Sequence, residues 1–170
     1  ATKLLVDLGL KPLMLGGEHS ISFGAIKSIA NLKSDLILIQ LDAHADLRQS
    51  WMGSKYNHAC TMRRCLDILP NEHVLQVGIR SGTYEEFQEL KINNRLITQI
   101  PGKPALELKK RLEQFKGKPI YLTVDLDWFD PSILPGTGTP EPGGFFWQDF
   151  AEIINVIQNH ELIGADIVEL

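Results

Sequence analysis

The feature that most constrains the fold is an apolar run at residues 36–39, followed almost directly by Asp-Ala-His-Ala-Asp at 42–46. Such a run is typical of a strand that is buried on both faces, as in a parallel sheet. If the extended backbone continues, Asp42, His44 and Asp46 point to one side, because alternate residues of a strand share a face. This arrangement indicates a metal site; the alternative is a polar loop in which an Asp caps the next helix.

Five further segments have the apolar pattern of strands, and helical patterns separate most of them. The expected strands are 12–15, 74–79, 95–97, 120–124 and 162–169, and the expected helices are 1–9, 23–32, 58–69, 104–116 and 147–158. This alternation predicts an α/β fold with a mostly parallel sheet. With no repeat or linker in the sequence, residues 1–170 are expected to form a single catalytic domain.

Charge and hydropathy exclude several classes of function. A net charge of -4, without a run of Lys and Arg, argues against a nucleic-acid surface. No stretch is long and apolar enough to suggest a membrane span. The two cysteines, Cys60 and Cys65, are too close together to connect distant parts of the fold, so we expect a reducing, cytoplasmic location. His73 and His160 lie in charged, turn-like surroundings and are expected at the surface.

Polar side chains also follow three other expected strands, at His19, at Asp125 with Asp127, and at Glu169. The carboxyl ends of parallel strands meet at one edge of a sheet, so these groups are expected to converge with those of residues 42–46. Individually, His19 or Asp127 could instead cap a helix.

Four carboxylates and two imidazoles in one cleft require cations. Each close pair of like charges would cost roughly 4 kcal/mol at an effective dielectric near 20. Two divalent ions would cancel this charge, and a set of oxygen ligands with some imidazole suits manganese, with iron, cobalt, nickel or zinc as alternatives. The Gly-rich loop at 135–140 lacks the Lys-Ser/Thr pair of a phosphate-binding loop, so we do not interpret it as a nucleotide site.

Five motifs together resemble those of the ureohydrolases, the family of arginase and agmatinase. They are Gly-Gly-Glu-His-Ser at 16–20, Asp-Ala-His-Ala-Asp at 42–46, Asp-Leu-Asp at 125–127, Gly-Thr-Gly-Thr-Pro at 136–140 and Asp-Ile-Val-Glu at 166–169. The resemblance implies a three-layer α-β-α fold. It also implies a fragment that lacks two N-terminal strands and a C-terminal helix, so that six of eight strands remain.

The same resemblance implies two Mn²⁺ ions per chain. One ion would be held by His19, Asp42, Asp46 and Asp125, and the other by Asp42, His44, Asp125 and Asp127. It further implies that His58 is the acid/base group near the leaving amine, and that Glu169 binds the guanidinium. The alternative for Glu169 is a cap on the missing helix.

The implied chemistry is hydrolysis of a guanidino group to urea and an amine. A guanidinium carbon is a poor electrophile, so attack needs a strong nucleophile such as a metal-bridging hydroxide. Asp127 could accept a hydrogen bond from that hydroxide, His58 could protonate the departing amine, and Glu169 could grip the cation.

We expect agmatine as the substrate, with putrescine and urea as products in polyamine biosynthesis, because residues 46–48, 56–64 and 139–144 are more similar to agmatinases. Arg48 replaces an Asn of the arginases. It either ties the loop to a carboxylate or faces a substrate carboxylate, which would favour guanidinobutyrate. Arginine and formiminoglutamate are further alternatives, as are a one-zinc deacetylase and a non-catalytic binding protein. We expect a homo-oligomer with a small-molecule substrate.

Overall fold

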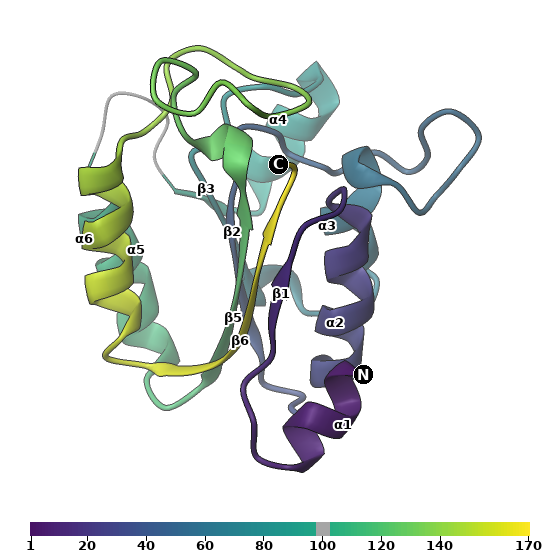
Figure 1. Ribbon diagram of the computed structural model, residues 1–170, viewed down its shortest axis with the longest axis vertical. Helices are drawn as coiled ribbons and strands as arrows, with labels where there is room; N and C mark the ends of the chain where they lie inside the picture. The colour runs from purple at the N-terminus through teal and green to yellow at the C-terminus, as the bar shows by residue number, and fades with distance from the viewer. Residues whose placement is uncertain (98–102) are drawn as a thin grey trace.

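The computed structural model describes residues 1–97 and 103–170, and a parallel β-sheet forms its centre. Within the described residues the sheet has six strands, in the order β1-β6-β5-β2-β3-β4. The strands are β1 (Leu13–Leu15), β2 (Ile37–Leu41), β3 (Val74–Val77), β4 (Leu96–Ile97), β5 (Pro119–Asp125) and β6 (Glu161–Val168). All neighbouring strands are parallel, so their carboxyl ends lie at one edge, at the top of Figure 1.

Helices cover both faces of the sheet (Figure 1). The α-helices are α1 (Thr2–Asp7), α2 (Ser20–Ala30), α3 (Thr61–Leu66), α4 (Tyr84–Ile92), α5 (Pro104–Leu112) and α6 (Trp147–Ile157), and the 3-10 turns are η1 (His58–Cys60), η2 (Asn71–His73), η3 (Glu113–Phe115) and η4 (Leu126–Trp128). One hydrophobic core joins α5 and α6 to the sheet, and a second core joins α2, α3 and α4 to it. The expected three-layer α-β-α architecture is therefore confirmed.

The central strands explain why this edge is a firm support for a site. Every residue of β2 and β5 is buried, as the apolar runs in the sequence indicated. Fully burying one Leu or Ile side chain contributes roughly 1.5–3 kcal/mol, so these strands resist displacement. A side chain that directly follows β2 or β5 is thus attached to a fully buried, stable strand, so its backbone has a fixed position.

Two features differ from the sequence interpretation. Helix α4 was not expected, because its apolar periodicity is weak, although Thr83 and Glu86 form a capping box at its start. The prediction that His73 is solvated is wrong. His73 is buried, with Nε2 3.0 Å from Lys118 Nζ and its ring edge-on to Phe115. In the described residues, no helix is both long and apolar enough to cross a membrane.

Candidate metal centre and active site

Six acidic and histidine side chains converge at the carboxyl edge of the sheet. Asp42 follows β2 directly, Asp125 ends β5, and His19 stands at the start of α2. The His19 side chain makes no cap hydrogen bond, so the helix-cap alternative does not account for it. Instead the imidazole is fully buried and faces the carboxylates.

The first group surrounds His19 Nδ1. This atom lies 3.1 Å from an oxygen of Asp42, 3.1 Å from an oxygen of Asp46 and 3.3 Å from an oxygen of Asp125. All four side chains are buried. Three elements that are distant in sequence therefore present one nitrogen and three oxygens to the same point.

The second group surrounds His44 Nδ1. This atom lies 2.8 Å from Asp127 Oδ2 and 3.7 Å from Asp42 Oδ1. Asp42 and Asp127 are buried, whereas a quarter of the His44 side chain is exposed. Asp42 offers one oxygen to each group, so the two groups are adjacent and share this carboxylate.

The carboxylates reach these positions through turns and not through a continued strand. β2 ends at Leu41, and Asp46 has a φ of 55°, in the left-handed region that non-glycine residues rarely adopt. Asp42 Oδ1 accepts the N–H of His44 at 2.5 Å, and Asp127 Oδ1 accepts the N–H of Ala43 at 3.0 Å. The same carboxylates that face the histidines thus also hold the turn in shape.

The cap at η4 belongs to Asp125 and not to Asp127. Asp125 Oδ1 accepts the N–H of Asp127 at 2.9 Å, while its other oxygen faces His19. The alternative that Asp127 merely caps the residues after it is therefore not what the structure shows.

The electrostatics of the cluster favour a bound cation. Burial and the charge of Asp42 raise the pKa of Asp46 and of Asp125 well above the usual range for a carboxyl. Burial alone would also raise the pKa of Asp42, but the adjacent imidazoles of His19 and His44 lower it. A divalent cation would remove the repulsion that raises these pKa values.

The donor atoms fit a pair of divalent metal ions. His19 Nδ1 is buried and has no hydrogen-bond partner among the described residues, although three carboxylates surround it. A buried polar atom is costly to leave unpaired, and a metal ion would satisfy its lone pair. Imidazole with several carboxylates is the ligand set that suits manganese and related ions.

Hydrogen bonds behind His19 orient its ring. Thr123 Oγ1 donates to Asp166 Oδ1 at 2.6 Å and lies 2.9 Å from His19 Nε2. Since the hydroxyl proton goes to Asp166, the Thr123 oxygen accepts from the imidazole, and Nε2 carries the hydrogen. Tyr121 donates to the other oxygen of Asp166 at 2.7 Å. His19 Nδ1 is therefore left with a free lone pair that points at the carboxylates.

Two further residues with a role in the site were not identified from the sequence. Arg80 Nη2 donates to the carbonyl oxygens of Asp127 at 2.6 Å and Glu141 at 2.9 Å, which ties together both ends of the loop after β5. Glu141 Oε1 accepts from Ser81 Oγ at 2.8 Å and lies 3.5 Å from His44 Nε2. Contacts to backbone carbonyls leave no sequence signal, so only the structure could show them.

A pocket of about 370 Å³ opens beside the cluster, and His44, Asp46 and Asp125 contribute to its wall. His58 and Glu169, which were expected to act on the substrate, also line it. Glu169 directly follows β6, has a φ of 65°, and accepts the N–H of His19 at 2.7 Å through Oε1.

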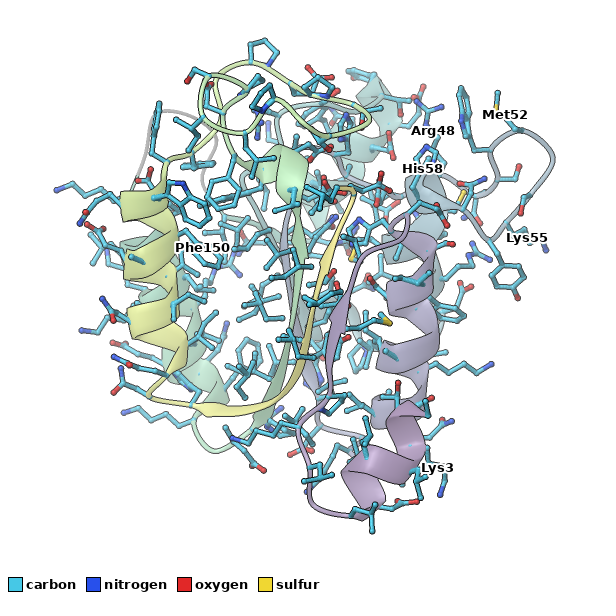
Figure 2. The ribbon with its side chains drawn as sticks, in the orientation of Figure 1. Lys3, Arg48, Met52, Lys55, His58 and Phe150 are labelled. Carbon is cyan, nitrogen blue, oxygen red and sulfur yellow. The ribbon has the colours of Figure 1, made fainter. Side chains whose placement is uncertain are left out.

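The outer wall of the pocket includes Arg48 and Trp51. The Arg48 guanidinium lies 4.0 Å from the centre of the Trp51 ring, which is a cation–π contact. Among the described residues Arg48 has no carboxylate partner, so the alternative that it ties the loop to a carboxylate is not seen. Figure 2 shows Arg48 and His58 on the same side of the molecule, beside the loop that carries Met52.

Comparison with known proteins is consistent with this geometry. The sequence matches the Arginase family over residues 1–170. It is 40% identical over 169 residues to an agmatinase of Bacillus anthracis, covering 98% of this chain and 57% of that protein. A guanidinobutyrase of Pseudomonas aeruginosa is 36% identical over 170 residues, covering 95% of this chain and 53% of that protein.

A solved structure, the agmatine ureohydrolase of Thermoplasma volcanium, superposes with a TM-score of 0.87 at 36% identity. The match covers 99% of this chain and 57% of that one. The chain thus spans little more than half the length of these relatives.

Proposed function

The chain belongs to the arginase family, and we propose that its protein hydrolyses agmatine to putrescine and urea at a dinuclear manganese site. The observation that carries this proposal is the convergence of two histidine–carboxylate groups that share Asp42, beside a pocket lined by His58 and Glu169. The names of the agmatinases among the relatives support agmatine as the substrate.

We assign the ligands as two sets. His19, Asp42, Asp46 and Asp125 would hold one ion, and Asp42, His44, Asp125 and Asp127 would hold the other. When bound, the ions supply a nucleophile at neutral pH by lowering the pKa of water. Asp127 Oδ2, which lies 3.2 Å from the hydroxyl of Thr139, would accept a hydrogen bond from the attacking water and orient it.

The protein's other groups act on the substrate. Glu169 binds the guanidinium, which cannot lose its proton, through charge-assisted hydrogen bonds. The attacking oxygen forms a bond to the guanidinium carbon and, after losing its remaining hydrogen to solvent, becomes the carbonyl oxygen of urea. When the C–N bond to the departing amine breaks, its electron pair stays on nitrogen. The imidazolium of His58 gives that nitrogen a proton and becomes neutral. The products are urea and the free amine.

A substrate panel tests the proposal. The manganese-loaded protein should release urea from agmatine, and the same protein stripped of metal should not. Urea release that is equal with and without metal would refute the metal mechanism. An ion count of one zinc per chain would instead favour a deacetylase-like reaction.

A guanidino acid is the second candidate substrate, because Arg48 offers a cation to the pocket without a carboxylate partner among the described residues. The guanidinobutyrase relative is in keeping with this alternative. The far end of agmatine is an ammonium that Arg48 would repel, whereas the carboxylate of guanidinobutyrate would be attracted. Comparing kcat/KM for the two compounds decides between them. Cytoplasmic location and homo-oligomerisation stay predictions.

A further inference from the structure

Glu18 connects the β1–α2 segment to His58. Its Oε2 accepts the backbone N–H of His58 at 2.7 Å and lies 3.5 Å from the Nδ1 of the same residue. Its other oxygen, Oε1, accepts a hydrogen bond from the hydroxyl of Ser20. One carboxylate therefore bonds the backbone of a residue that is 40 positions away and lies beside the ring of that residue.

We infer that Glu18 is a positioning residue for His58, an inference that rests on the proposed function. A carboxylate beside Nδ1 favours the ring orientation in which Nδ1 carries a hydrogen toward Glu18. Nε2 is then the nitrogen that meets the departing amine. Glu18 acts through the imidazole, because His58 lines the pocket and Glu18 is not among its lining residues.

The surroundings of His58 place this pair where the proton is needed. A ring nitrogen of His58, a carboxylate oxygen of Glu18 and a carboxylate oxygen of Glu169 all lie within 4.8 Å of one another. Glu169 is the carboxylate assigned to the guanidinium, so the proton donor stands next to the group that fixes the substrate. A ring held by Glu18 is thereby aligned with a substrate held by Glu169.

The solvent exposure of Glu18 and His58 distinguishes a positioning role of Glu18 from a role in folding stability. The side chains of Glu18 and His58 are 45% and 48% exposed. An ion pair at such an exposed position contributes little to folding. Loss of the carboxylate should therefore change turnover far more than it changes the melting temperature.

A double-mutant cycle tests the inference on the manganese-loaded protein. Glu18→Gln keeps the shape of the side chain, and we expect kcat to fall about 10-fold, as is usual when a hydrogen bond to a charged group is weakened. In the His58→Ala background the same change should lower kcat no further. Metal content and melting temperature should match the wild type. Glu152→Gln, an exposed carboxylate change on α6, is the control and should leave kcat unchanged.

The leaving group provides a second measurement. An agmatine analogue with oxygen attached to the departing nitrogen releases a much less basic amine, which needs less help from an acid. Glu18→Gln should therefore lose less activity on this analogue than on agmatine. Equal losses on both substrates, an undiminished effect in the His58→Ala background, or loss of metal would overturn the inference. A wild-type protein that releases no urea from any guanidino compound would overturn the proposed function as well.

Discussion

Replacing Thr123 with Val tests how strongly its hydroxyl orients the His19 nitrogen that we propose as a metal ligand. Val has the shape of Thr and suits a central strand, so the backbone of β5 should not change. The change removes two buried hydrogen bonds, from His19 Nε2 at 2.9 Å and to Asp166 Oδ1 at 2.6 Å. Asp166 keeps its bond from Tyr121, but the Nε2–H of His19 loses its partner.

The expected magnitudes follow from these two contacts. A buried group left unpaired costs about 1–3 kcal/mol. Because the Nε2–H of His19 is left in this state, the metal-free protein should lose about 1–3 kcal/mol of unfolding free energy. The imidazole is also free to move its hydrogen to Nδ1, which blocks the lone pair, and loss of such a partner weakens metal affinity by about 10–100-fold.

Two assays on the metal-stripped protein check this prediction. Competition with a chelator gives the apparent Kd for Mn²⁺, and thermal unfolding gives the stability. Thr61→Val is a matched control, because Thr61 is also buried and, among the described residues, its hydroxyl bonds only the backbone carbonyl of Asn57, at 3.2 Å. An unchanged Kd in Thr123→Val, alongside a lowered melting temperature, would show that the hydroxyl serves stability alone and would refute the argument.

Three further predictions concern the site itself. Asp42→Ala should remove at least one ion per chain and abolish activity, because Asp42 faces both groups; metal analysis that still finds two ions would remove this assignment. His58→Ala should keep both ions but lower kcat by roughly 10²–10⁴-fold, since its proposed task is proton delivery, and stopped-time urea assays would measure the loss. Glu169→Gln should lower kcat/KM by at least about 10-fold with metal content unchanged, because the guanidinium loses its counter-charge. Intact kinetics with a lower melting temperature would instead make Glu169 a structural residue.

The groups that converge could be predicted from the sequence because they obey one rule of parallel sheets. Asp42 follows β2 and Asp125 ends β5; both strands are fully buried and have an unmistakable apolar pattern. A polar residue directly after such a strand must lie at the carboxyl edge, whatever the neighbouring loops do. The order of the strands is not needed for that conclusion, so an error there would not have moved the site.

The residues that orient those groups could not be predicted in the same way. Thr123 lies inside β5 and looks like an ordinary strand position. Asp166 lies inside β6 and belongs to the motif at 166–169, but the motif alone does not assign it a contact with His19. Their role appears only because the register pairs Thr123 with Asp166 and brings both to His19. Register between strands that are distant in sequence is set by the tertiary packing, and no local pattern reports it.

The left-handed backbone at Asp46 and Glu169 is the most informative feature that the sequence hid. Both residues have positive φ values, 55° and 65°, without being glycine; Glu169 directly follows β6, and Asp46 lies in the turn after β2. Such a conformation costs of order 1 kcal/mol or more and persists only where the surroundings determine it. A glycine would relieve the strain but would carry no carboxylate. The backbone of Asp46 and Glu169 is therefore unfavourable at positions where each carboxylate turns back toward His19. The site gives up some folding stability in order to place these negative charges.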